Sequence, residues 1–140
     1  MNTQADVIVA GIGGAGASAL YHSARRGLRV IGLDRFAPGH DRGSSHGETR
    51  VIRQAYFEHP DYVPLLQRAY ALWRDLEDES SESLLHLCGL LMVGPEDGEI
   101  IAGSRLAAAR YGLPLEQVDE VTLREQFPAL RIPEDAVTAW

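Results

Sequence analysis

The sequence has 140 residues, of which 45% are hydrophobic, and this length and composition are typical of one soluble domain or of part of a larger one. Its 20 acidic residues outnumber 13 basic ones, and the formal charge of −7 disfavours nucleic acid and anionic membranes as partners. All 13 basic residues are arginine, which excludes a Walker-type phosphate loop and a Schiff-base lysine from this chain.

Cysteine, histidine and the apolar runs exclude further classes. Cys88 is the single cysteine, so no internal disulfide or thiolate zinc cluster can form, and we expect a cytoplasmic location. The histidines lack the spacing of a metal site, and we expect no metal. The longest apolar stretch, residues 84–93, is far shorter than the roughly 20 residues of a membrane span.

The first 34 residues predict a βαβ unit. Residues 6–10 form an apolar, β-branched run that ends at Gly11. Small residues then recur at helical spacing up to Gly27, which is a plausible helix stop, and residues 28–34 predict a second buried strand. A strand, turn, helix and strand within about 30 residues indicate a Rossmann-like α/β fold.

The turn after the first strand carries a dinucleotide-binding motif. Residues 11–16 match G-x-G-x-x-G, whose glycines allow a sharp turn, close approach of a pyrophosphate and close packing of helix on strand. Asp34 ends the second strand 18 residues beyond Gly16, where a carboxylate would accept hydrogen bonds from ribose hydroxyls. The residues predicted here to bind the cofactor are Gly11, Ile12, Gly13, Gly14, Ala15, Gly16, Asp34 and Arg35.

The motif itself does not choose between NAD and FAD. NAD-dependent domains usually continue into further βα units, whereas FAD proteins of the glutathione-reductase type leave the half-domain early. Residues 37–50 are rich in Gly, Ser, His and Pro without an apolar period, and such a long loop favours FAD. Asp34 disfavours NADP, whose 2′-phosphate it would repel. An NAD-dependent dehydrogenase and a non-catalytic dinucleotide-binding fragment remain alternatives.

The same region is locally basic. Between residues 35 and 53, four arginines outnumber Asp41 and Glu48, so the segment suits an anionic ligand such as a carboxylate or a reduced flavin. The four arginines are Arg35, Arg42, Arg50 and Arg53.

Beyond this loop, helices and strands are expected to alternate. The pattern predicts an amphipathic helix over residues 62–76, then a solvated acidic loop over 77–82. Further expected elements are one or two buried strands within 84–93 that enclose Cys88, a helix over 98–111 capped by Gly112, a strand over 113–118, a helix over 121–127 and the start of a strand at 137–140. Because natural termini usually end in polar residues, the apolar end leads us to expect an incomplete fragment.

The stretch 43–56, G-S-S-H-G-E-T-R-V-I-R-Q-A-Y, resembles a loop of the monomeric sarcosine oxidases and N-methyl-tryptophan oxidases. These are FAD-dependent amine oxidases of the D-amino-acid-oxidase superfamily. The resemblance continues through Tyr62-Val63-Pro64-Leu65, Leu72-Trp73, Cys88-Gly89, Gly94-Pro95, Phe127-Pro128 and Ile132-Pro133. It implies an oxidase of secondary amines or N-methyl amino acids that uses oxygen and yields an imine, then an aldehyde, and hydrogen peroxide. It also implies a monomer more than twice this length, and an inactive isolated fragment.

The resemblance assigns roles to individual residues. It places His46 and Arg50 against the flavin ring as the catalytic pair, and it makes Arg53 the arginine that binds the substrate carboxylate. It places Ser44, Ser45, Thr49 and Arg50 on the cofactor, although Ser45 stands where the family often has a second histidine. Covalent attachment of FAD would use a cysteine outside this chain, not Cys88. Residues 1–60 would form the FAD-binding unit with its flavin-contacting loop, and residues 61–140 would lead into the substrate domain.

Overall fold

A computed structural model describes residues 4–133 and 136–139. The chain forms two compact units that meet between residues 50 and 51. Unit 1 comprises the chain up to Arg50, and unit 2 begins at Val51. This division lies ten residues before the domain boundary expected at residue 60. The expected boundary concerns which residues serve FAD and which lead into the substrate domain, and it stays a prediction.

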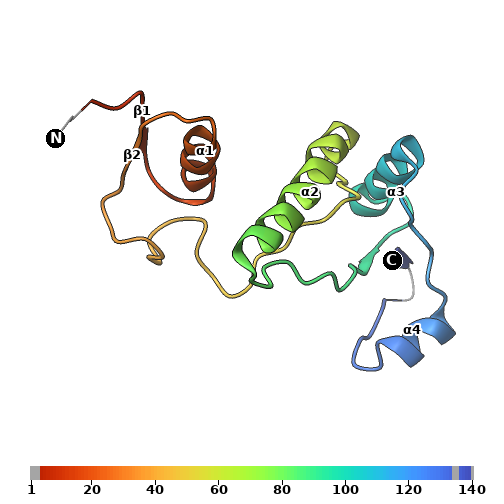
Figure 1. Ribbon diagram of the computed structural model, residues 1–140. Helices are drawn as coiled ribbons and strands as arrows, with labels where there is room; N and C mark the ends of the chain where they lie inside the picture. The colour runs from red at the N-terminus through yellow and green to blue at the C-terminus, as the bar shows by residue number, and fades with distance from the viewer. Residues whose placement is uncertain (1–3, 134–135, 140) are drawn as a thin grey trace. The chain divides into compact units, whose positions relative to one another are not determined.

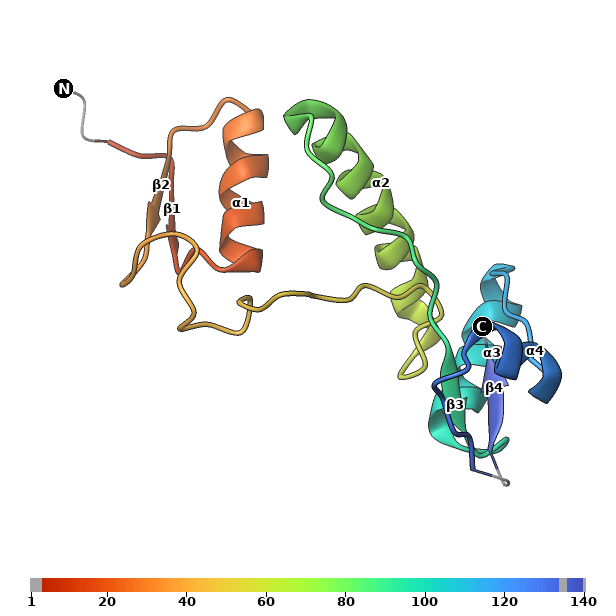
Figure 2. The same cartoon turned by 90° about the horizontal axis from the view of Figure 1, so that it is seen from below.

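Unit 1 is the predicted βαβ unit. Strand β1 (Val7–Ala10), helix α1 (Gly14–Arg25) and strand β2 (Val30–Leu33) follow one another, and the two strands pair in parallel from Val7 opposite Val30 to Ala10 opposite Leu33. Helix α1 lies along one face of this sheet (Figures 1 and 2). The contact is close, because a Cβ atom at Gly32 would lie 2.6 Å from Cδ1 of Leu20.

Half-buried and exposed side chains alternate along both strands, and the sheet face turned away from α1 is apolar. Ile8, Ile31 and Leu33 are exposed by 62%, 41% and 54%. We call these three residues the bare face of unit 1. Side chains of one strand alternate between the two faces, so the half-buried Val7 and Val9 pack toward α1 while Ile8 does not.

Residues 34–59 contain no helix or strand. This confirms the loop predicted over residues 37–50. Gly39 and Gly47 have φ values of +83° and +119°, which L side chains rarely adopt. The loop conformation therefore depends on its glycine content.

Unit 2 contains the remaining elements. They are the 3₁₀ turn η1 (Pro60–Tyr62), α2 (Val63–Ser80), β3 (Met92–Gly94), α3 (Glu99–Tyr111), α4 (Glu120–Gln126) and β4 (Val137–Ala139). Strands β3 and β4 pair antiparallel beside α3 (Figure 2). Ile101 of α3 and Met92 of β3 form the buried core there, packed by Ala55, Leu115 and Val137.

Several predicted elements of unit 2 are confirmed. Helix α3 ends at Gly112, whose φ of +62° makes it the expected left-handed cap. Helix α4 ends just before Phe127-Pro128, as predicted, and its first turn is capped by the Asp119 carboxylate, which accepts the Thr122 N–H at 2.8 Å. Strand β4 covers three of the residues expected at 137–140, and Trp140 lies outside the described residues.

The prediction of an acidic loop over residues 77–82 is wrong for its first residues, which are helical. Helix α2 continues to Ser80 and ends at Ser81, which adopts a φ of +57°. The Glu77 carboxylate accepts the backbone N–H groups of Leu84 and Leu85 at 2.7 and 2.9 Å. These bonds lower the pKa of Glu77, that from Leu85 most strongly. Glu77 is thus a structural residue that fixes how the chain leaves α2.

The strand prediction within residues 84–93 is confirmed only at its end, where β3 begins at Met92, and the strand predicted over 113–118 is wrong. Residues 84–91 have no strand, and Leu84, Leu87 and Leu90 are exposed. Cys88, expected inside a buried strand, is exposed as well. An apolar run becomes a strand only when a neighbouring strand pairs with it, and β3 finds a partner for only three residues. No helix within residues 4–133 and 136–139 is long and apolar enough to cross a membrane.

The bare face predicts the behaviour of the isolated chain. We expect the 140-residue chain to bind a hydrophobic dye and to self-associate, because Ile8, Ile31 and Leu33 expose contiguous apolar surface. Dye fluorescence and sedimentation velocity measure these properties. Replacing both Ile8 and Ile31 with threonine should lower dye binding and association. The control Val121→Thr alters a residue of α4 that is 67% exposed and should change neither. A monomer that binds no dye would contradict the expectation.

Candidate cofactor site

The turn between β1 and α1 requires glycine at two positions, Gly11 for its backbone conformation and Gly16 for lack of space. Gly11 has a φ of +88°, which favours glycine, and its N–H donates to the Leu33 carbonyl of β2 at 2.7 Å. A Cβ atom at Gly16 would lie 1.8 Å from the Gly11 carbonyl oxygen. The first and third glycines of the motif therefore have the structural roles that the sequence predicts.

The N-terminus of α1 has features that favour an anion. Gly13 is the N-cap residue and has no side chain to satisfy the first amides of the helix, and the first turn carries no acidic residue. The helix dipole adds partial positive charge at this end. The Gly14 N–H donates to the Ser45 hydroxyl at 2.8 Å, so the loop is brought onto the helix N-terminus.

Asp34 connects the end of β2 to the glycine turn. Its Oδ2 accepts the Ile12 N–H at 2.7 Å, and its Oδ1 accepts the Phe36 N–H at 3.1 Å. These bonds, that from Ile12 first, lower the pKa of Asp34 and keep the carboxylate ionised near neutral pH. Oδ2 has a further lone pair, so the carboxylate can still accept a hydrogen bond from a hydroxyl group of a ligand.

His40 lies against Asp34, and our sequence analysis assigned it no role. Its Nε2 is 3.4 Å from Oδ1 of Asp34, and its Nδ1 accepts the Arg42 N–H at 3.0 Å. The ring meets the Phe36 ring edge to face, with centroids 5.1 Å apart. The composition of residues 37–50 marked a functional loop, but only the folded loop shows which histidine reaches Asp34.

The flavin-contacting loop predicted at residues 43–50 brings His46 and Arg50 together. Nδ1 of His46 contacts the Gly43 carbonyl, and Nη1 of Arg50 donates to the His46 carbonyl at 3.4 Å. Both residues are exposed, as are Ser44 and Thr49. The loop thus presents an imidazole and a guanidinium to the surroundings of unit 1.

Arg53 belongs to unit 2 and has a different environment from Arg50. Its guanidinium carbon lies 4.4 Å from the ring centroids of both Tyr56 and Phe57. Its Nη2 is paired with the Glu58 carboxylate. Its Nε is buried and has no hydrogen-bond partner among the described residues. Arg53 also lines a cavity of about 310 Å³, whose other lining residues are Val51, Ile52, Tyr56 and Leu66.

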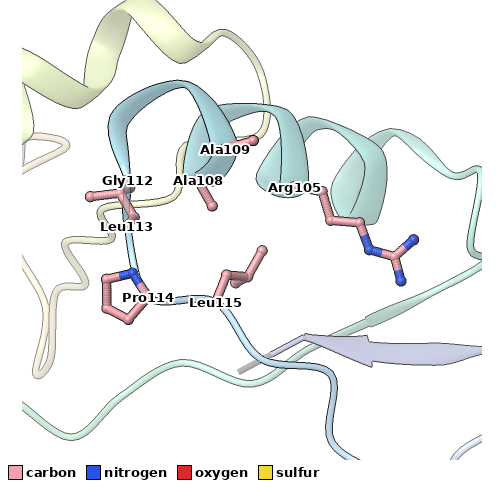
Figure 3. A pocket seen from close by; sticks show the side chains of 7 residues that line it. All are labelled: Arg105, Ala108, Ala109, Gly112, Leu113, Pro114 and Leu115. Atoms are coloured by element: carbon pink, nitrogen blue, oxygen red, sulfur yellow. The ribbon is translucent and has the colours of Figure 1, made fainter.

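A second cavity, of about 610 Å³, lies at the end of α3 (Figure 3). Its lining contains none of the predicted site residues. Its charged residue, Arg105, is bonded to Glu96 and Gln117 at 3.2 and 3.3 Å. The lining is otherwise Ala108, Ala109, Gly112, Leu113, Pro114 and Leu115. Without a free polar group this cavity offers no chemistry. No group of three His, Cys, Asp or Glu side chains in the described ranges could hold a metal ion.

The family model for FAD dependent oxidoreductases, DAO, matches residues 6–140. The chain belongs to this family. It is 44% identical over all 140 residues to monomeric sarcosine oxidase of Streptomyces avermitilis and covers 36% of that protein. It is 37% identical over 135 residues, 96% of the chain, to N-methyl-L-tryptophan oxidase of Yersinia pestis, and again covers 36%. The chain thus spans about a third of the length of these curated relatives.

Solved structures agree with the family assignment. NikD, described as an unusual amino acid oxidase essential for nikkomycin biosynthesis, matches 96% of the chain with a TM-score of 0.83 and 27% identity in its Tyr258Phe mutant. The chain covers 35% of that protein. The family resemblance and the α/β fold class inferred from the sequence are confirmed, and FAD is the cofactor of the family.

The glycine turn allows a direct stability test. Gly16→Ala should destabilise folding by about 1–3 kcal/mol and reduce bound FAD, because only a backbone shift relieves the contact with the Gly11 carbonyl. Gly14→Ala is the matched control, since its Cβ would lie 3.3 Å from the Ser45 hydroxyl, which can rotate, and alanine favours the helix. Chemical denaturation of the FAD-free protein measures the stability of both variants, and flavin absorbance measures the FAD bound to each. Equal stability of the two variants would contradict the packing role of Gly16.

Proposed function

We propose that the intact protein carrying this chain is an FAD-dependent oxidase of a secondary amine, with an N-methyl amino acid as the substrate class. The 44% identity to a monomeric sarcosine oxidase over the whole chain carries this proposal, together with the H-G-E-T-R-x-x-R loop. The products are an imine that hydrolyses to an aldehyde, and hydrogen peroxide from oxygen. We further propose a cytoplasmic monomer, with residues 1–60 serving FAD and residues 61–140 leading into the substrate domain.

The residues of unit 1 fit a dinucleotide. Gly13 supplies no side-chain cap to the α1 amides, which suits a pyrophosphate there. A Cβ atom at Gly13 would lie 3.2 Å from the Ser45 hydroxyl, so Ser45 borders this proposed site. Asp34 would accept hydrogen bonds from the ribose hydroxyls. The proposed contacts comprise Gly11, Ile12, Gly13, Gly14, Ala15, Gly16, Asp34, Arg35, Ser44, Ser45, Thr49 and Arg50.

Bound FAD would accept the hydride from the carbon beside the amine nitrogen and pass electrons to oxygen. In our proposal Arg50 supplies positive charge beside the flavin ring, and His46 packs against the same ring. The Arg50 side chain bonds to the backbone carbonyl of His46, which supports a placement of Arg50 beside this part of the loop. Covalent attachment would require a cysteine outside this chain, since Cys88 belongs to unit 2 and does not match the attachment position.

Arg53 is the proposed carboxylate-binding residue. A carboxylate is held best by two parallel N–H groups of one guanidinium, and the buried Nε of Arg53 is an unused donor beside the cavity of about 310 Å³. The rings of Tyr56 and Phe57 both lie against the guanidinium, which limits its motion. Glu58 neutralises the charge while no carboxylate is bound.

The reaction class can be tested on the purified intact protein. We expect flavin absorption in the visible range and peroxide formation with sarcosine or another N-methyl amino acid as substrate. The same assay with the corresponding primary amino acid serves as the control and should give less peroxide. A colourless protein that oxidises substrates with NAD would replace this proposal with a nicotinamide-dependent dehydrogenase.

Substitutions can separate the two arginines. Arg53→Ala should weaken binding of an unreactive carboxylate such as acetate by about 2–5 kcal/mol and leave flavin content unchanged, because it removes the partner of the carboxylate. Arg50→Ala should instead lower the rate of flavin reduction or the yield of covalent flavin, with a smaller effect on acetate binding. Flavin absorbance and acetate titration measure both. Equal loss of acetate affinity, with flavin intact in both variants, would refute this division of roles.

A further inference from the structure

His40 occupies a position whose contacts are more specific than an exposed loop residue requires. Its side chain is 22% exposed, and that of Asp34 is 13% exposed, so the contact between the two is partly shielded from water. The Phe36 ring packs edge to face against the imidazole and fixes its plane. His40 is therefore held against the carboxylate that we propose binds the ribose.

The hydrogen bond at Nδ1 determines where the imidazole carries its proton. Nδ1 accepts the Arg42 N–H at 3.0 Å, so it has no proton of its own, and the neutral ring carries its proton on Nε2. Nε2 is the atom that lies 3.4 Å from Oδ1 of Asp34. The Arg42 amide thus sets the tautomer, and the ring presents a polarised N–H to Asp34.

The surroundings of this pair are cationic. The guanidinium carbons of Arg35 and Arg42 lie 5.5 and 5.9 Å from the centroid of the Phe36 ring. Asp41 is paired with Arg42 at 3.3 Å. From the glycine turn only a neutral group, the Ile12 N–H, binds Asp34. Asp34 thus accepts hydrogen bonds from the amides of Ile12 and Phe36, and Nε2 of His40 lies 3.4 Å from its Oδ1.

We propose that His40 is a positioning residue for the adenosine half of the dinucleotide. Its Nε2–H lies against Oδ1 and holds the Asp34 carboxylate in the orientation in which the remaining lone pair of Oδ2 faces a ribose hydroxyl. This inference rests on the proposed ribose-binding role of Asp34. The expected ligand chemistry is an adenosine with free 2′ and 3′ hydroxyls, and the flavin ring has no part in it.

Two substitutions separate the contact with Asp34 from the contact within the loop. His40→Asn keeps a short acceptor for the Arg42 amide but does not reach Asp34. His40→Gln extends an amide N–H to the place of Nε2. We expect His40→Asn and His40→Ala to weaken ADP binding about three- to tenfold, and His40→Gln to restore it to within about twofold of the original protein. Isothermal titration of ADP into the FAD-free intact protein, produced under riboflavin limitation, measures these affinities.

His59 provides a matched control. Its Nδ1 accepts the Asp61 N–H at 3.2 Å. Nδ1 of His40 accepts the Arg42 N–H in the same way, and in both cases the donor lies two residues further along the chain. His59→Asn and His59→Ala should leave ADP affinity unchanged, since the contacts of the His59 ring are with Asp61.

A double-mutant cycle distinguishes the two levels of the proposal. Asp34→Asn should itself weaken ADP binding, and adding His40→Ala to it should cause little further loss, because His40 acts through Asp34. If Asp34→Asn binds ADP normally, the ribose role in the proposed function fails. If Asp34→Asn weakens binding while His40→Asn and His40→Ala do not, or if the losses are additive, the role of His40 is overturned and the ribose role of Asp34 stands.

Discussion

The close approach of α1 to the turn that precedes it is the constraint on which unit 1 depends. The Cα of Gly16 lies so near the Gly11 carbonyl that a methyl group would overlap it. This approach sets the helix directly against β1 and β2 and turns its N-terminus toward the carboxyl ends of the strands. The N-cap residue, Gly13, supplies no side chain to the first amides of α1, and this makes the site suitable for a pyrophosphate.

Two chain segments are attached to this turn by single polar groups. The Asp34 carboxylate binds the Ile12 amide, and the Ser45 hydroxyl binds the Gly14 amide. Asp34 thereby places the end of β2 at the proposed ribose position, and Ser45 places the loop that carries His46 and Arg50. The residues expected to contact different parts of FAD therefore depend on amides of one turn, and a change in the turn would displace them together.

The Arg53 guanidinium is held by aromatic rings and a carboxylate, whereas the cofactor site depends on backbone amides. Its guanidinium is stacked by two aromatic rings and paired with Glu58, but Nε has no partner among the described residues. A buried donor without an acceptor costs free energy, so it favours a ligand that supplies an acceptor. The proposed substrate carboxylate would remove this cost. The buried Nε donor is thus the observation that supports the proposed role of Arg53.

The sequence by itself determined the βαβ unit, the glycine turn, the family and the end of α3 at Gly112. These features depend on local backbone requirements and on the period of apolar residues, which are written in adjacent positions. Only the tertiary structure decided that residues 84–91 and 113–118 form no strands, that Glu77 binds the amides of Leu84 and Leu85, and that His40 reaches Asp34. Strand pairing and side-chain contacts join residues distant in the sequence or fixed by an irregular loop, and no local pattern encodes which partner comes within reach.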